Sequence, residues 1–163
     1  MLQRPAEPVS LARGLAVAED LVATMRALPR CVGLAAPQVG EPVRVAVVDV
    51  AGHPAAAARH GLLVLVNPTI VQAVGREVAR EGCQSLPQFA VDVARARRIL
   101  VASDLHPELW SAGFEARAIQ HEIDHLSGLL ILDRAATARA IHRRPAVASL
   151  EAQTSPAAGR RSP

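Results

Sequence analysis

The amino-acid sequence predicts an α+β fold in which antiparallel β-sheets pack around a central helix that carries a His-Glu-x-x-His motif, with a second helix near the N-terminus. Several short β-branched or apolar runs follow one another between residues 44 and 102. A single buried helix over residues 114–127 is expected after them. Strands that occur in succession, rather than alternating with helices, are typical of antiparallel sheets. The length of 163 residues fits one domain with a sizeable core.

The N-terminal helix is expected over residues 11–28. Ser10 can cap it, apolar side chains recur at helical spacing, and Pro29 ends it. Residues 31–40 form a Gly-, Ala- and Pro-containing segment with few large side chains. Four later segments have the composition of strands: residues 44–50, 62–66, 69–74 and 91–102. Polar stretches with Gly or Pro are expected as loops and turns: residues 52–61, 67–68, 81–87 and 104–113.

The motif helix is expected to stop at Gly128, because glycine readily takes the left-handed conformation that ends helices. Beyond it we expect a short strand over residues 129–132 and a last helix over residues 135–144. From Pro145 onward, the Ala, Ser, Pro and Arg content predicts a disordered tail. The predicted organisation is therefore one domain at residues 1–144 and a tail at residues 145–163.

Composition argues against two classes of partner. The aromatic residues are Phe89, Trp110 and Phe114, with no Tyr, so the stacking surfaces that bind single-stranded nucleic acids are missing and we expect no DNA partner. No apolar run approaches the ~20 residues that span a bilayer, and the N-terminus lacks the charged-then-apolar pattern of a leader. We therefore expect a cytoplasmic protein without a membrane partner, in which Cys31 and Cys83 are thiols or ligands rather than a disulfide.

The chain has 18 basic residues, all of them Arg, and 15 acidic ones, which gives a formal net charge of +3. The basic residues gather at residues 95–98, 143–144 and 160–161. Solvated surface charge explains most clusters of this kind. The alternative is contact with a polyanion such as ribosomal RNA.

The motif itself indicates metal-dependent chemistry. His121 and His125 are four residues apart, so on a helix they share one face and can bind one metal ion. Glu122 follows the first histidine and can take a proton from a water on that metal. The alternative is an ordinary amphipathic helix with solvated polar residues.

A catalytic site of this type needs a third protein ligand. The metzincin pattern would place a histidine at position 131, which is Ile131, and the thermolysin pattern would use a later glutamate, for which Glu151 in the predicted tail is the only candidate. The remaining soft ligand is Cys83, which has a glycine before it and polar neighbours. A Cys-His-His set suits Fe(II), Zn or Ni.

Three segments together resemble the signature motifs of the peptide deformylase family, in order and at suitable separations. They are Gly33-Leu34-Ala35-Ala36-Pro37-Gln38-Val39-Gly40, Glu81-Gly82-Cys83-Gln84-Ser85 and Gln120-His121-Glu122-Ile123-Asp124-His125. The resemblance covers residues 6–134. It implies that residues 1–144 are a catalytic domain that removes the formyl group from the N-terminal N-formylmethionine of nascent polypeptides and releases formate.

The resemblance also implies roles for individual residues. Cys83, His121 and His125 would bind one divalent metal ion, with Fe2+ the usual native ion and Zn2+, Ni2+ or Co2+ as alternatives. Hydroxide on the metal would attack the formyl carbon, with Glu122 as general base and then as proton donor to the leaving amine. The side-chain N–H of Gln38 and the backbone N–H of Gln84 would stabilise the developing oxyanion.

Small residues near Gly33 would let a peptide backbone approach closely. The residues expected to contact substrate are Val32, Gly33, Leu34 and Ala118, with the stem of Arg117 as a further part of an apolar pocket for the methionine side chain. Glu81 is expected to pair with Arg95 and so to fix the loop that carries Cys83. For Asp124, we expect a solvated or salt-bridged position rather than a catalytic one.

The chain departs from the family pattern at three places. Cys31 replaces a usual glycine, and its Cβ would be strained if the backbone there had φ > 0. Gln84 stands where Leu is common, but a role of the backbone N–H does not depend on the side chain. The lead-in before the first helix is short and lacks a Pro-Asp-Pro stretch, which weakens the expectation of a first strand there.

Two other functions are weighed against an active deformylase. One is a catalytically weak or inactive deformylase-like protein that binds metal or associates with the ribosome, and the intact Glu122 argues against it. The other is a zinc endopeptidase, which the missing downstream ligand disfavours. We expect a monomer whose partners are formylated nascent peptides, with transient ribosome contact as a further possibility.

Overall fold

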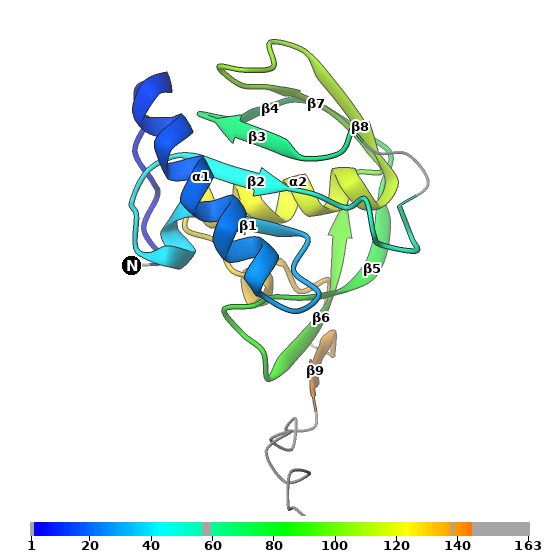
Figure 1. Cartoon of the computed structure of the whole chain (residues 1–163). Helices are drawn as coiled ribbons and strands as arrows, with labels where there is room; N and C mark the ends of the chain where they lie inside the picture. The colour runs from blue at the N-terminus through cyan, green and yellow to red at the C-terminus, as the bar shows by residue number, and fades with distance from the viewer. Residues whose placement is uncertain (1, 57–59, 138, 145–163) are drawn as a thin grey trace, which may run out of the picture.

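The computed structural model describes residues 2–56, 60–137 and 139–144 (Figure 1). Within these residues the α-helices are α1 (Leu11–Ala27) and α2 (Gly113–Leu126). Two short 3-10 helices are η1 (Ala36–Val39) and η2 (Ile131–Arg134). The tail expected from residue 145 onward lies outside the described residues. Neither described α-helix has the length and apolar character needed to cross a bilayer.

The strands form three antiparallel sheets of three strands each, counted over the described residues. The β1 sheet has the order β1 (Gly33–Ala35), β2 (Val45–Val48), β3 (Leu63–Val66). The β4 sheet has the order β4 (Thr69–Val74), β7 (Arg98–Ala102), β8 (Leu109–Ala112). The β5 sheet has the order β5 (Glu77–Gly82), β6 (Phe89–Arg95), β9 (Ile141–Arg143). The predicted fold class, α+β with antiparallel sheets, is therefore confirmed.

Helix α2 lies at the centre of the molecule, behind β2 in the view of Figure 1 and with strands on several sides. Its apolar residues Ala116, Ile119 and Ile123 belong to the largest core cluster, together with inward-facing residues of the β1 and β4 sheets. Helix α1 covers the other face of the β1 sheet, where Leu21 and Met25 pack against Leu34 and neighbouring valines. The β1 sheet is thus sandwiched between the two helices.

The C-terminal end of α2 is closed as the sequence predicts. Gly128 has φ 74°. Its N–H donates to the carbonyl of His125, and the N–H of Leu129 donates to the carbonyl of Asp124 at 2.9 Å. These two bonds form a Schellman motif. A side chain at Gly128 would also collide with the backbone of Arg4, since an added Cβ would lie 2.9 Å from its carbonyl carbon.

Several element predictions are confirmed and others are wrong. The helix and strand segments predicted at 11–28, 44–50, 62–66, 69–74 and 114–127 are present. The strand material at 91–102 is two strands, β6 and β7, joined by a tight connection. Ser10 precedes α1 but its side chain makes no capping bond. The lead-in forms only an isolated parallel bridge between Glu7 and Val43, in place of a first strand.

The errors concern short elements. The expected loop at 104–113 contains β8, whose four residues alternate between buried and exposed. Residues 129–132 are not a strand; a 3-10 helix begins at Ile131. The helix predicted over 135–144 is wrong, because residues 141–143 pair with β6. In that segment, tertiary pairing overrides the helix propensity of the alanines. Strands β1 and β5 were not predicted.

Candidate metal centre

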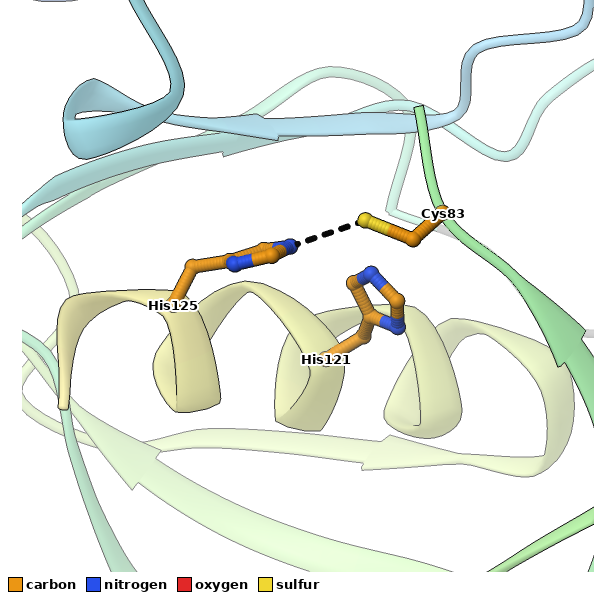
Figure 2. A group of neighbouring side chains, drawn as sticks. All are labelled: Cys83, His121 and His125. Atoms are coloured by element: carbon orange, nitrogen blue, oxygen red, sulfur yellow. Dashed lines mark hydrogen bonds between the residues drawn. The ribbon is translucent and has the colours of Figure 1, made fainter. Parts of the chain in front are cut away.

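Three candidate ligands converge from two elements. Cys83 directly follows β5, and His121 and His125 project from α2 one turn apart (Figure 2). Their ligand atoms all lie within 4.8 Å of one another, and Sγ of Cys83 is 3.2 Å from Nε2 of His125. Around a tetrahedral ion with Zn–S of ~2.3 Å and Zn–N of ~2.0 Å, ligand atoms are about 3.5 Å apart. The three side chains are therefore close enough together to bind one metal ion.

The orientation of His121 is fixed by a carboxylate. Its Nδ1 lies 3.0 Å from Oε2 of Glu81, which leaves Nε2 free for a metal. A carboxylate behind a histidine ligand sets the tautomer and the ring orientation. Arg95 in turn holds Glu81 with two bonds of 3.0 Å, from Nε to Oε1 and from Nη2 to Oε2. Glu81 and Arg95 are thus brought together as the sequence suggests.

Charges at the centre favour a cation. Burial raises the pKa of Cys83, but hydrogen bonds from His121 and His125 outweigh it and lower the pKa from 9.0 to about 5. For His121, burial lowers the pKa, whereas the bonds to Cys83 and Glu81 raise it, and the net effect is a pKa well above 6.5. The thiolate and the Glu81 carboxylate thus stabilise positive charge between them. A metal ion can take the place of the proton there.

Glu122 is buried beside these ligands with an unused oxygen. The residue is 5% exposed, and its Oε2 has no hydrogen-bond partner in the described part of the chain. Burial raises the pKa of this carboxyl, and the charges of the two histidines only partly oppose it. Gly33 on β1 faces the carboxyl so closely that a Cβ there would lie 2.5 Å from Oε1. Glycine at position 33 therefore makes the space that Glu122 occupies.

Both ends of the Gln38 amide are held. The backbone N–H of Ala35 donates to Oε1 at 2.8 Å, which defines the orientation of the amide. Nε2 donates to Oγ of Ser85 at 3.0 Å and lies 4.0 Å from Sγ of Cys83. The 3-10 helix η1 presents this side chain, and Gly40 closes the helix with φ 93°. The amide nitrogen of Gln38 is thus aimed at the metal centre.

The side chain of Gln84 points away from the candidate ligands. It is exposed, and Nε2 donates to the carbonyl of Pro29 at 3.2 Å. The backbone N–H of Gln84 has no partner among the hydrogen bonds of the described residues. It is therefore available to a bound molecule.

The residues expected to contact substrate are differently placed. Val32 is partly buried and Ala118 is buried, and both belong to or pack against the central core cluster. The Leu34 side chain is 2% exposed and packs toward α1, so only its backbone can face a ligand. The Arg117 side chain is also buried, but its guanidinium reaches Glu81, with Nη1 2.7 Å from Oε1. The guanidinium is therefore not available to a substrate pocket, and only the stem is left for the predicted pocket role.

Two polar residues of the third motif have partners that the sequence did not reveal. Gln120 is buried and bonds both backbone groups of Ala96, receiving its N–H at 2.9 Å and donating to its carbonyl at 3.0 Å. Asp124 is buried and accepts bonds from Arg95 and from Nε and Nη2 of Arg134. The expected salt-bridged position of Asp124 is present. Nothing in the spacing alone identifies Ala96 or Arg134 as partners.

The substitution at Cys31 causes no backbone strain. Strain would require a positive φ at Cys31, and the positive φ occurs instead at the preceding residue, Arg30, where it is 56°. The Cys31 thiol donates to the carbonyl of Gly33 at 3.1 Å. Burial raises the pKa of Cys31, so this second thiol remains protonated at neutral pH and does not compete as a thiolate.

A thiolate and two imidazoles beside a buried, unpaired carboxylate define a metal-dependent hydrolase. The comparisons with known proteins specify which one. The family model described as polypeptide deformylase matches residues 1–140, and the chain belongs to the peptide deformylase family.

Individual relatives agree with this assignment. Peptide deformylase of Dictyoglomus thermophilum is 46% identical over 123 residues, covering 73% of this chain and 74% of the relative. Peptide deformylase of Halothermothrix orenii is 37% identical over 140 residues, covering 82% of this chain and 86% of the relative. The Met-Ala-Ser-bound crystal structure of a class I type b peptide deformylase from Acinetobacter baumannii has a TM-score of 0.74 and 34% identity, covering 82% of this chain and 91% of that one. The crystal structure of peptide deformylase from Thermotoga maritima has a TM-score of 0.70 and 36% identity, covering 83% of this chain and 91% of that one.

Proposed function

We propose that this chain removes the formyl group from N-formylmethionine at the start of nascent polypeptides, using Cys83, His121 and His125 as metal ligands and Glu122 as the proton carrier. The observation that carries the proposal is the unpaired, buried Oε2 of Glu122 beside the three converging ligand atoms. A structural metal site needs ligands but no adjacent base. The Acinetobacter baumannii relative was crystallised with Met-Ala-Ser bound, a peptide that begins with methionine, as the peptide product of deformylation would.

We propose Fe2+ as the ion, because it is the usual native ion of the family. The thiolate and imidazole donors also suit Zn2+, Ni2+ or Co2+. When bound, the ion supplies a nucleophile at neutral pH by lowering the pKa of a water toward ~7. The low pKa of Cys83, about 5, means that the thiol need not lose a proton at neutral pH when metal enters.

Glu122 is suited to move the proton. The pKa of a general base works best near the operating pH, and burial raises that of Glu122 in this direction. Oε2 accepts the proton of the attacking water, and the same carboxyl then donates it to the nitrogen of the leaving amine. Gly33 leaves the room in which Oε1 sits, so the carboxyl faces both the ligands and the β1 edge.

Two donors are proposed for the negative charge that develops on the formyl oxygen. Nε2 of Gln38 has its direction fixed by Ala35 at the opposite end of the amide, and the Gln84 backbone N–H has no internal partner among the described residues. Each preorganised donor of this kind is worth about 3 kcal/mol in the transition state. An amide donates without adding a charge that would compete for the thiolate.

Substrate specificity and cellular context are also proposals. Val32, Ala118 and the stem of Arg117 line the methionine side chain, and the backbone of Gly33 and Leu34 runs along the peptide. The protein acts as a cytoplasmic monomer on formylated nascent chains, and its exposed arginines contact the ribosome transiently. Residues 1–144 form the catalytic domain.

The test is formate release from a formyl-Met tripeptide by protein purified without oxygen, beside the acetyl-Met tripeptide as control. We expect rapid formate release from the formyl substrate. The acetyl substrate would yield acetate, so its free N-terminal amine is measured instead, and we expect none, because acetyl is larger by a methyl at a tight site. Glu122→Ala should retain the metal and lose the activity. No formate from a fully metal-loaded wild type would overturn the proposal, and so would full activity in Glu122→Ala.

A further inference from the structure

The candidate ligands belong to two parts of the molecule that have separate apolar cores. His121 and His125 lie on α2, whose apolar side chains pack with the β1 and β4 sheets. Cys83 follows β5, and the apolar side chains of the β5 sheet pack with η2 in a cluster of their own, around Val91 and Val93. The spacing between the cysteine and the histidines therefore depends on how α2 is joined to the β5 sheet.

That junction consists of buried charges. Glu81 and Arg95 of the β5 sheet are 7% and 5% exposed, and Arg117 and Asp124 of α2 are 7% and 6% exposed. Arg95 pairs with Glu81 within its own sheet and with Asp124 across the junction. Buried charges of this kind fix geometry only when every one is paired.

Arg117 makes three bonds across the junction from its two terminal guanidinium nitrogens. Its Nη1 donates to Oε1 of Glu81 at 2.7 Å and to the carbonyl of Val93 at 3.0 Å. Nη2 donates to the carbonyl of Glu77 at 3.0 Å. One guanidinium thus ties α2 to both ends of β5 and to β6, and it does so one helical turn before His121.

We propose that Arg117 is a positioning residue for the metal centre. Its guanidinium holds the β5 sheet against α2 at the spacing at which Cys83, His121 and His125 can share one ion. Glu81 is the shared point, because Arg117 binds Oε1 while His121 binds Oε2. Loss of the guanidinium leaves Oε1 of Glu81 with Arg95 as its remaining partner and removes the bonds to the carbonyls of Val93 and Glu77. The His121 ring is then held less firmly, and the Cys83 loop can move relative to α2. The inference rests on the proposed ligand set.

Metal binding tests this role directly. Arg117→Met keeps the apolar stem and removes the three bonds, whereas Arg80→Met is the matched control. Arg80 lies on β5 too, but it is exposed and pairs with Asp92, with Nε 2.9 Å from Oδ1. The readouts are the dissociation constant for Co2+, by competition with a chelator, and the thiolate-to-Co2+ charge-transfer absorption. That absorption reports the geometry at Cys83 whatever the activity.

We expect Arg117→Met to weaken Co2+ binding about 10- to 100-fold, the range found when partners behind metal ligands are removed, and to shift the charge-transfer band. Arg80→Met should change neither. Unaltered affinity and an unaltered band in Arg117→Met would overturn the inference. If Arg117→Met does not fold, Arg117→Lys decides in the same way, since lysine keeps the charge but its single nitrogen does not reach the acceptors that Nη1 and Nη2 bond separately.

Failure of the ligand set is distinguishable from failure of this inference. If wild-type protein binds Co2+ without a thiolate charge-transfer band, then Cys83 is not a ligand and the proposed function is at fault. If the wild type shows the band and Arg117→Met matches it, only the positioning role is lost.

Discussion

Two buried glutamates on α2 should respond in opposite ways to the same substitution. Glu115 is 1% exposed and its carboxyl accepts three hydrogen bonds, from Oγ of Ser111 at 2.8 Å and from the backbone N and Nδ1 of His60, both at 2.7 Å. Glu122 is 5% exposed and its Oε2 has no partner in the described part of the chain. We therefore expect Glu115→Gln to cost stability and Glu122→Gln to cost activity.

The magnitudes follow from these contacts. Hydrogen bonds to a charged group contribute about 1.5–3 kcal/mol each, and an amide can keep some of those at Glu115, so Glu115→Gln should lower the free energy of unfolding by about 2–3 kcal/mol. At Glu122 there is no bond to Oε2 to lose, and a buried charge is removed, so the free energy of unfolding should stay level or rise. Loss of a general base lowers kcat about 10²- to 10⁴-fold, or roughly 3–5 kcal/mol of transition-state stabilisation.

Urea denaturation of the metal-free proteins measures the first effect, and formate release by the metal-loaded proteins measures the second. The pH dependence of the stability difference between the two proteins gives a further test, because its direction can be predicted. Because the folded state raises the pKa of Glu122 above its ordinary value of 4.5, the wild type should lose stability relative to Glu122→Gln as the pH rises through the folded-state pKa. The reasoning is refuted if Glu122→Gln unfolds at clearly lower urea than the wild type, or if Glu115→Gln abolishes formate release while remaining folded.

Three further outcomes are expected. Cys83→Ser should bind metal at least 10-fold more weakly or exchange it, since a hard oxygen replaces the thiolate; elemental analysis after dialysis checks this, and full occupancy would show that Cys83 is not a ligand. Gly33→Ala should lower kcat with metal retained, because the new Cβ would lie 2.5 Å from Oε1 of Glu122; an unchanged kcat would contradict it. The folded state lowers the pKa of Glu81 from 4.5 to about 2. Stability on the order of 3 kcal/mol that is present above pH 4.5 should therefore be lost as the pH falls toward 2. Urea denaturation across pH checks this, and the Glu81→Gln variant should lack the dependence.

The sequence predicts the parts of this fold that have strong local signals. Long amphipathic or motif-bearing helices and β-branched strands were located, as were the three candidate ligands. The short elements were missed because their structure depends on distant partners. Residues 141–143 of β9 are a strand only because β6 lies beside them, and β5 is mostly exposed, so its sequence has no clear alternation of apolar and polar residues.

The surroundings of the site could not be predicted for the same reason. Motif spacing identifies His121 and Glu81 but not the bond between them, since the two residues are 40 positions apart. The stem of Arg117 looks apolar enough for a pocket wall, and only the fold shows where its guanidinium ends. Cys31 raised an expectation of strain that depended on a backbone angle, and that angle occurs one residue earlier.

Hydrogen-bond partners separate the structural polar residues of α2 from the chemical ones. A helix buried on all sides normally carries apolar residues, because each buried polar group without a partner costs free energy. Gln120 and Asp124 satisfy this requirement through Ala96, Arg95 and Arg134. Among the described residues, the buried side-chain atoms that do not are Oε2 of Glu122 and Nδ1 of His125. His125 lies beside Sγ of Cys83 through Nε2, so a shared metal ion would not relieve the cost at Nδ1. Oε2 belongs to Glu122, the residue that the motif assigns to proton transfer, so its cost falls where an attacking water can relieve it.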